Sequence, residues 1–266
     1  MKRKTELYSF TYKDYSEKVY RDIRKETFGN DIGQNSWLSA GEMREIIKIL
    51  DLKPGKSVLE IASGSGGPAV FTAASSGCIL TGLEYDINGV KNSNELAKIN
   101  GLDKQMNFIH GDASERLPFN KETFDAVYCI DAINHLKNRD KVLKEIYRVL
   151  KPGGRLVYTD PIVVSGILTN EEISIRSSIG FFLFVPAGFN EMLLKAAGFK
   201  KITSKDVTVS MAKISLKWFR AREKRKKLLL KTEDKTNFSE LQEFFKMVNK
   251  LAAEKRLSRI MFTAVK

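Results

Sequence analysis

Short apolar runs alternate with amphipathic segments through the middle of the chain. Seven of these runs have the length and composition of strands, at residues 57–62, 78–83, 106–110, 124–130, 155–159, 201–209 and 258–265. Helical patterns separate most of them, for example at residues 88–100 and 139–150. Strands joined by helices of this length form right-handed βαβ crossovers, so the pattern predicts an α/β fold with a mostly parallel sheet.

The two ends of the chain have helical patterns of their own. Tyr15, Val19 and Ile23 recur every four residues, which predicts a helix, and a capping-box pattern from Ser39 to Glu42 opens a second helix. We interpret the mostly helical residues that precede the seventh strand as a lid. The chain then divides into a helical cap at 1–50, an α/β core at 51–209, a basic lid at 210–257 and a final core strand at 258–266.

Charge is distributed unevenly along the chain. The formal net charge is +13, and the whole excess lies in residues 195–266, whereas residues 1–194 are balanced. This argues against a surface built throughout for nucleic acid and indicates one local basic element.

Cys78 and Cys129 are the only cysteines, and both lie in apolar runs. Two cysteines cannot form a zinc cage, so we expect no metal site, and we interpret them as buried thiols in a reducing compartment. The first residues have no apolar stretch behind their charges, and the longest apolar run, residues 179–185, is far shorter than the ~20 residues that span a bilayer. We therefore expect a soluble, cytoplasmic protein.

The most informative segment is VLEIASGSGG at residues 58–67. An apolar strand there runs into Gly64, Gly66 and Gly67, and a helix follows. Glycines allow positive-φ bends and a close approach of the backbone to a ligand, while the helix N-terminus offers unpaired N–H groups. Ligands of open α/β sheets bind at such carboxyl ends of strands.

Acidic residues follow the next two strands. Glu84 ends the second strand about 20 residues after Gly64, where a carboxylate can accept both hydroxyls of a ribose. Asp112 follows the third strand and can accept from an adenine amino group, with the Ala113 amide facing a ring nitrogen. Each feature alone is also typical of a simple turn or a helix N-cap, but the three in order favour a nucleoside site.

The same loop also fits the dinucleotide fingerprint G-x-G-x-x-A, from Gly64 to Ala69. An NAD(P)-dependent oxidoreductase with a Rossmann fold is therefore the alternative prediction. Two features argue against it. Glu60 stands inside the strand, where a hydride-transfer enzyme usually has an apolar residue, and the last strand follows a lid rather than a second mononucleotide half.

Several motifs in order resemble those of class I S-adenosylmethionine-dependent methyltransferases over residues 40–266. They are Glu60-x-x-x-Gly64-x-Gly66-Gly67, Gly82-Leu-Glu84, Gly111-Asp-Ala113, FDAVY at 124–128 and LKPGG at 150–154. The resemblance implies a Rossmann-like, doubly wound, seven-stranded and mostly parallel sheet with an antiparallel last strand and a helical lid. It also implies S-adenosyl-L-methionine as the cofactor of the core at 51–209, with S-adenosyl-L-homocysteine as the product.

The resemblance further implies a role for each motif. Glu60 lies near the methionine amino group, the glycine loop wraps the methionine, Glu84 binds ribose and Asp112 contacts adenine. Two departures, Ala62 in place of a common glycine and Glu84 in place of a common aspartate, leave these roles intact. The cofactor-binding residues that we expect are Glu60, Ala62, Gly64, Gly66, Gly67, Glu84, Tyr85, Asp112, Ala113, Ile130 and Asp131.

Residues 131–136, DAINHL, resemble the branch that methylates small molecules such as phosphoethanolamine, sarcosine and dimethylglycine, tocopherol or sugars. His135 is our candidate base. Tyr15 is the second catalytic candidate, with Tyr12 as the alternative, because this branch places a tyrosine of an N-terminal helix against the substrate. Other interpretations stay open: a structural histidine, a packing helix that carries both tyrosines, and for Trp37 either closure over the cofactor or a place in the core.

Two later segments bear on the acceptor. Residues 179–185, IGFFLFV, can line an apolar pocket, form a dimer contact or pack in the core. The basic residues 213–231 can capture a phosphate or carboxylate substrate, make a peripheral contact with an anionic membrane or RNA, or form a solvated helix. No aromatic β platform accompanies them, which argues against nucleic acid as a partner.

The sequence therefore predicts transfer of a methyl group to N, O or C of a small-molecule acceptor by in-line displacement. Such a reaction needs proximity and exclusion of water more than a covalent nucleophile. The acceptor is either anionic or amine-bearing and drawn in by the basic lid, or apolar and held by Phe181, Phe182 and Phe184. No motif encodes the identity of the acceptor, the acceptor atom or the oligomeric state.

Overall fold

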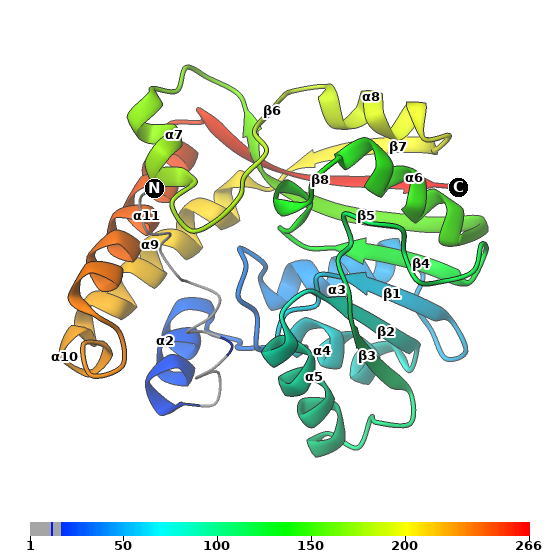
Figure 1. The fold of residues 1–266 in the computed structure, drawn as a ribbon, viewed down its shortest axis with the longest axis horizontal. Coiled ribbons are helices and arrows are strands. Elements are labelled where there is room, and N and C mark those ends of the chain that lie inside the picture. Colours follow the sequence, from blue (N-terminus) through cyan, green and yellow to red (C-terminus); the bar gives the residue numbers. More distant parts are fainter. Residues whose placement is uncertain (1–11, 13–16) are drawn as a thin grey trace.

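The computed structural model describes residue 12 and residues 17–266. One sheet forms its centre, with the strand order β3-β2-β1-β4-β5-β8-β7 and the short β6 paired to β5 (Figure 1). The strands are β1 (Ser57–Ile61), β2 (Ile79–Glu84), β3 (Met106–His110), β4 (Phe124–Cys129), β5 (Leu150–Val164), β6 (Val185–Pro186), β7 (Lys200–Asp206) and β8 (Leu257–Val265). β8 runs antiparallel to both β5 and β7, and the other pairings are parallel.

This arrangement confirms the predicted fold class. All seven expected strands are present, the last of them is antiparallel, and β6 is an additional strand of two residues. The largest difference in bounds is at β5, which begins at Leu150 rather than at Arg155. Leu150 already pairs with Phe124 of β4, and the register shifts before pairing resumes at Arg155. The Pro-Gly-Gly segment therefore ends the preceding helix without ending the contact between the two strands.

Helices cover both faces of the sheet. The crossovers contain α4 (Gly67–Ser76), α5 (Ile87–Ile99) and α6 (Arg139–Val149), and α8 (Phe189–Ala196) precedes β7. Because side chains of a strand alternate between its faces, Val127 and Cys129 of β4 point into one apolar core, and Ala126 and Tyr128 into the other. The sheet is thus buried on both faces, as expected for parallel strands.

Helix α3 (Ala40–Ile49) begins as the sequence predicts, with one difference. The Ser39 hydroxyl accepts a hydrogen bond from the backbone N–H of Glu42 at 3.1 Å and caps the helix. The Glu42 carboxylate does not complete a capping box, because it pairs with Arg259 of β8. The side chain that local sequence assigns to the helix end is therefore used for a contact between distant segments.

The remaining helices gather at one side of the sheet (Figure 1). They are α2 (Lys18–Phe28), α7 (Asn170–Arg176), α9 (Thr208–Lys224), α10 (Lys226–Leu229) and α11 (Lys235–Ala253). A third core, rich in aromatic residues, holds α2, α9 and α11 together and includes Tyr20, Trp37, Trp218 and Phe245. The helices α9, α10 and α11 lie between β7 and β8 in sequence, and their role as a lid stays a prediction.

Cys78 and Cys129 are buried free thiols, as predicted. Burial raises the pKa of both thiols, which makes them poor nucleophiles. Within the described part of the chain, no helix combines the length and the apolar character needed to cross a bilayer.

Candidate functional site

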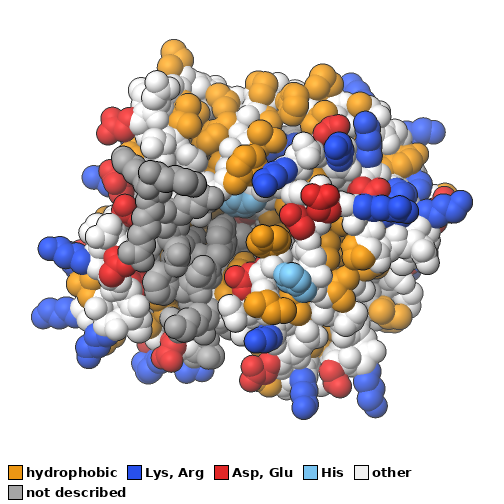
Figure 2. All heavy atoms as spheres, viewed as in Figure 1, with side chains coloured by type: hydrophobic (Ala, Val, Ile, Leu, Met, Phe, Trp, Pro, Cys, Tyr) orange, Lys and Arg blue, Asp and Glu red, His pale blue; other side chains and the backbone are white. Residues whose placement is uncertain are grey.

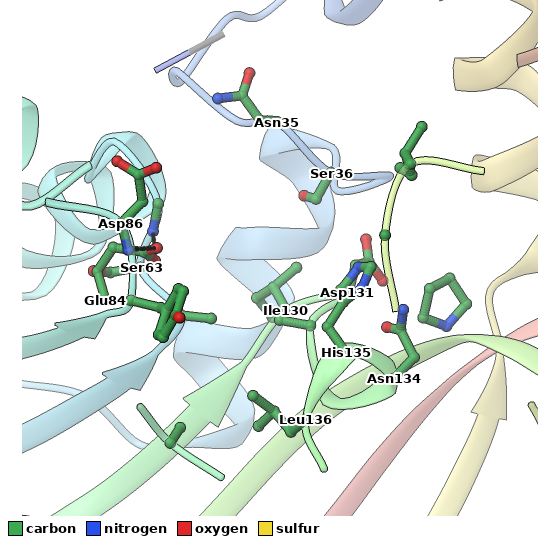
Figure 3. A pocket seen from close by; sticks show the side chains of 18 of the residues that line it. Asn35, Ser36, Ser63, Glu84, Asp86, Ile130, Asp131, Asn134, His135 and Leu136 are labelled. Carbon is green, nitrogen blue, oxygen red and sulfur yellow. Dashed lines mark hydrogen bonds between the residues drawn. The ribbon is translucent and has the colours of Figure 1, made fainter. Parts of the chain in front are cut away.

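A cavity of about 530 Å³ opens at the carboxyl ends of β1 to β4 (Figure 3). Its volume lies in the range of small-molecule sites. Most of the predicted cofactor-binding residues line it: Glu60, Ala62, Gly64, Glu84, Tyr85, Asp112, Ala113, Ile130 and Asp131. Gly66 and Gly67 form the turn behind the lining.

Of the predicted catalytic residues, His135 lines this cavity, while Tyr15 falls outside the described residues. Tyr12, the alternative tyrosine, is buried and also lines the cavity. Its backbone carbonyl accepts a hydrogen bond from the Asn92 side chain at 2.6 Å. The structure therefore brings one of the two candidate tyrosines to the site.

The turn after β1 is built from glycines that admit no side chain. Gly66 caps helix α4 with a φ of 77°, and a Cβ there would lie 2.9 Å from the Cα of Ser93. At Gly67 a Cβ would lie 2.4 Å from the carbonyl oxygen of Ile32. Both positions need glycine because neighbouring chain packs directly against the turn. Ala62 has a φ of 57°, which explains why a glycine is common there.

Glu84 ties the first two strand ends together. Its Oε2 accepts from the Gly64 backbone N–H at 2.8 Å, and its Oε1 accepts from the Asp86 backbone N–H at 2.9 Å. Burial raises the pKa of Glu84 above its ordinary value, although these N–H groups act in the opposite direction. Each carboxylate oxygen can accept a second hydrogen bond, so Glu84 can hold the loop and two hydroxyls of a ligand at once.

Glu60 is an acid enclosed at the base of the cavity, with 2% of its surface exposed. Burial, together with the nearby Glu84 carboxylate, raises the pKa of Glu60 well above its ordinary value. Its Oε2 has no hydrogen-bond partner among the described residues. A buried polar atom without a partner is unfavourable, and a cationic donor at this point would both satisfy it and favour its ionised form.

Asp112 and Ala113 follow β3 at the open rim of the cavity. Asp112 is exposed, and its Oδ1 accepts from the Ser114 backbone N–H at 2.8 Å. Tyr85 is 71% exposed and stands at the same rim, with its ring centroid 6.3 Å from that of His110. The predicted adenine end is therefore the wetter end of the cavity.

Asp131 belongs to a buried ion cluster that we call the Arg259 cluster, made of Arg259, Asp131 and Glu42. The Asp131 Oδ1 accepts from the Arg259 Nε at 2.7 Å, and its Oδ2 accepts from the Trp37 backbone N–H at 2.8 Å. Arg259 is fully buried and also pairs with Glu42 at 2.7 Å. One arginine of the last strand thus joins the end of β4, helix α3 and the Trp37 loop.

The protein groups around Asp131 bear on its predicted role. The Thr159 hydroxyl donates to the Oδ1 of Asp131 at 2.7 Å, in addition to Arg259 and Trp37. Most of the acceptor capacity of this carboxylate is therefore used within the protein. Its role as a cofactor ligand stays a prediction.

His135 ends the short 3-10 helix η1 (Ile133–His135), directly after β4. Its Nδ1 lies 2.8 Å from the carbonyl oxygen of Phe181, so this nitrogen carries the proton and donates. The ring packs edge-on against Phe182, with centroids 4.4 Å apart. Burial lowers the pKa of His135 to about 4, against the effect of the hydrogen bond to Phe181. The imidazole is therefore neutral near pH 7, with its acceptor lone pair on Nε2.

Aromatic side chains from distant segments wall the end of the cavity that lies away from the glycine turn. They are Trp37, Phe181, Phe182, Trp218, Phe244 and Phe245. The Trp37 ring lies 6.0 Å from Trp218 and 6.4 Å from Phe244, so it belongs both to the aromatic core and to the cavity wall. Phe184 packs in a separate apolar cluster and does not line the cavity.

Arg176 of α7 is a buried cation in this aromatic wall, with 1% of its surface exposed. Its guanidinium carbon lies 4.8 Å from the ring centroid of Phe182 and 5.2 Å from that of Phe244. Cation–π contacts of this kind partly replace the hydration of the guanidinium. No motif in the sequence points to Arg176 as a residue of the site.

The basic residues 213–231 lie away from this cavity. Lys224 and Arg225 pair with Glu26 of α2 at 3.3 and 2.7 Å, and the buried Arg222 pairs with Glu233 at 2.6 Å. Basic side chains project from the side of the molecule where α9, α10 and α11 lie (Figures 1 and 2). No cation of this segment lines the cavity, so the geometry does not support direct capture of an anionic acceptor by the lid. A contact with a membrane or RNA stays a prediction.

The residues that sequence reasoning missed reach the site through tertiary packing. A charged residue inside the apolar run at 258–265 was the one local signal for Arg259. Arg176, Trp218 and Phe244 carry no such signal, because only the packing of α7, α9 and α11 brings them together. Within the described ranges, no three His, Cys, Asp or Glu side chains are grouped so that they could hold a metal ion.

Comparisons with known proteins find a methyltransferase domain within the chain. Residues 59–158 match the family model described as a methyltransferase domain. Methyltransferase GfsG of Streptomyces halstedii is 34% identical over 131 residues, which are 48% of this chain and 46% of that protein. Sterol 24-C-methyltransferase erg6 of Schizosaccharomyces pombe is 35% identical over 150 residues, 56% of this chain and 37% of that protein. The matches thus span less than half of either relative.

A solved structure agrees over nearly the whole chain. Phosphoethanolamine N-methyltransferase 2 of Haemonchus contortus, in complex with S-adenosyl-L-methionine, is 26% identical with a TM-score of 0.79. The match covers 98% of this chain and 60% of that chain. These findings confirm the resemblance that the ordered motifs indicated.

Proposed function

Because residues 59–158 of this chain are a methyltransferase domain, we propose that the protein transfers a methyl group from S-adenosylmethionine to a small-molecule acceptor. The observation that carries this proposal is a pair of buried carboxylates, Glu60 and Glu84, on either side of the Gly64 turn in one cavity. The alternative, an NAD(P)-dependent oxidoreductase, finds no support in the comparisons.

The residues of the cavity fit this cofactor. The unpartnered Oε2 of Glu60 is suited to the ammonium group of the methionine, and the two oxygens of Glu84 are suited to the ribose hydroxyls. When bound, the cofactor supplies an electrophilic methyl carbon, whose bond to sulfur breaks as the lone pair of the acceptor bonds to it. The protein contributes alignment and exclusion of water.

We assign His135 to orientation of the acceptor rather than to proton removal. A group with a pKa of about 4 is a weak base near pH 7 and does not hold a proton taken from the acceptor. A neutral imidazole has both a donor and an acceptor nitrogen, which suits it to a hydroxyl or an amine. The contact of Nδ1 with Phe181 fixes the ring for this purpose.

The aromatic wall favours an acceptor with an apolar body. Phe182 and Phe244 flank the buried Arg176, while the cations of the basic segment lie elsewhere. Phe182→Ala is therefore expected to lower turnover of such an acceptor, and Lys224→Ala to leave it unchanged. The reverse result would favour an acceptor recruited by the basic lid.

Calorimetry with two cofactors tests the proposed function. We expect S-adenosylhomocysteine to bind tightly and NAD to give no heat of binding. Glu60→Gln and Glu84→Gln should weaken binding of S-adenosylhomocysteine, whereas Glu115→Gln, an exposed acid outside the cavity, should not. Absence of S-adenosylhomocysteine binding, or binding that the Glu60 and Glu84 variants retain in full, would contradict the proposal.

A further inference from the structure

Asn134 has a buried side-chain amide that the proposed function does not yet use. The residue is fully buried, lines the cavity and precedes His135 in η1. Neither its Oδ1 nor its Nδ2 has a hydrogen-bond partner among the residues that the structure describes. Figure 3 shows Asn134 next to His135 at the same end of the cavity.

The backbone carbonyl of Asn134, in contrast, has a partner at this end of the cavity. Its carbonyl accepts from the Leu183 N–H at 2.8 Å, two residues from the Phe181 carbonyl that holds His135. These two hydrogen bonds fasten the aromatic segment 179–185 onto η1. The turn is therefore held rigidly, and the unpartnered amide is not the result of a loose loop.

An unpartnered amide is unfavourable in a protein interior. Nearly all buried polar groups find a partner, and the exceptions call for an explanation such as a ligand. A leucine of similar size would fill the same space without leaving a donor and an acceptor unsatisfied. At Asn190, by comparison, a buried amide accepts from Arg139 at 2.8 Å and donates to Asp160 at 2.9 Å.

The chemistry of the Asn134 amide restricts which groups can bind to it. It presents one donor and one acceptor side by side. A purely anionic group satisfies the Nδ2 of Asn134 but leaves its Oδ1 without a donor. A purely apolar group satisfies neither. The complement is a neutral unit with an adjacent donor and acceptor, such as a carboxamide.

We propose that Asn134 binds the methyl acceptor and selects one that carries a neutral donor–acceptor pair, such as a carboxamide, next to the atom that is methylated. The inference rests on the proposed function, since it takes the aromatic end of the cavity as the acceptor site. It names a substrate class that differs from both a free anion and a purely apolar compound.

Thermal unfolding tests the premise without any substrate. We expect Asn134→Leu to raise the melting temperature of the ligand-free protein, because it removes two unsatisfied groups. Asn190→Leu, the matched control, should lower the melting temperature, because it removes one hydrogen-bond partner each from the buried Arg139 and Asp160. A melting temperature of Asn134→Leu below that of the wild type, or equal to it, would overturn the inference.

Binding of three simple probes to the protein saturated with S-adenosylhomocysteine tests the selectivity. Salicylamide, salicylate and phenol share one ring and hydroxyl but carry a carboxamide, an anion and no further group. We expect salicylamide to bind at least tenfold more tightly than the other two, and Asn134→Leu to abolish this preference. The inference would be overturned if the three probes bind equally or not at all, or if salicylate binds more tightly than salicylamide. It would also be overturned if Asn134→Leu keeps the preference for salicylamide.

The affinity for S-adenosylhomocysteine separates the two proposals. Asn134→Leu should keep this affinity within twofold of the wild type. A tenfold loss would assign the amide to the cofactor and overturn the inference while leaving the proposed function in place. Failure of the wild-type protein to bind S-adenosylhomocysteine would instead remove the proposed function itself.

Discussion

The two ends of the cavity are built in different ways. The end at the glycine turn comes from the ends of β1 to β4, so its residues follow one another within 60–131 of the sequence. The aromatic end collects side chains from η1, α7, α9 and α11, with Trp37 from the segment before α3. One end depends on strand order and backbone geometry, and the other on the packing of helices.

The two ends of the cavity therefore depend on different features of the sequence. Parallel neighbours place their carboxyl ends at one edge, so a loop and two acids after consecutive strands meet with little further instruction. The aromatic end has no equivalent rule. Its shape depends on which faces of α9 and α11 turn inward, and many sequences satisfy that requirement. We expect substitutions at the glycine turn to change the affinity for the cofactor, and substitutions at the aromatic end to change the use of the acceptor.

The largest expected effect comes from the Arg259 cluster, which joins both ends. Arg259→Met leaves the carboxylates of Asp131 and Glu42 buried without their cation, which should lower the free energy of unfolding by about 3–5 kcal/mol. Urea denaturation measures this change. Lys205→Met, which removes an exposed pair with Glu45, should change it by less than about 1 kcal/mol. Similar losses in the two variants would show that the cluster does not hold the ends together.

A smaller effect, restricted to the glycine turn, is expected for Gly66→Ala. The new Cβ meets the backbone of Ser93 and the left-handed φ adds strain, so affinity for S-adenosylhomocysteine should fall about 100-fold, or about 2.7 kcal/mol. Gly101→Ala has the same sign of φ but open space around the new Cβ, and it serves as the control. Calorimetry compares the two. Equal affinities in the two variants would show that the close packing at Gly66 does not shape the binding site.

Part of the fold and of the candidate site could be predicted from the sequence, and part could not. The strands, the place of Glu84 and the need for glycine at Gly66 follow from periodicity and spacing, because those constraints are local. The reason for Gly67 does not, since it is the Ile32 carbonyl, distant in sequence, that excludes a side chain. Arg176 could not be predicted for the same reason, because its partners Phe182 and Phe244 contact it only in the folded chain.

The pH dependence of stability sharpens the comparison at the glycine end. The pKa of Glu60 is raised by folding, so the folded protein binds a proton more tightly than the unfolded chain. Its contribution to stability is present below pH 4.5 and is lost as pH rises toward the folded pKa, by at most about 1.4 kcal/mol per pH unit. Glu60→Gln should remove this loss. Chemical denaturation at several pH values measures the difference between the two proteins, and parallel curves above pH 4.5 would contradict the prediction.

At the aromatic end, the corresponding test of pH dependence is His135→Gln. Folding lowers the pKa of His135 to about 4, so its contribution to stability is present above the unfolded value of 6.5 and is lost as pH falls toward 4. The wild type should therefore lose more stability than His135→Gln on acidification through this window. Turnover of the wild type should show no inflection near pH 6.5. A rate that rises with a pKa near 6.5, and loses that rise in His135→Gln, would restore a role in proton removal.

The position of Arg259 in β8 also has a consequence for biosynthesis. β8 pairs between β5 and β7, and its arginine is the partner of Asp131 near the middle of the chain. On the ribosome, residues 257–265 emerge after all other strands of the sheet. Asp131 is therefore synthesised well before the cation that pairs with it, and the pocket cannot reach its final form until β8 has emerged.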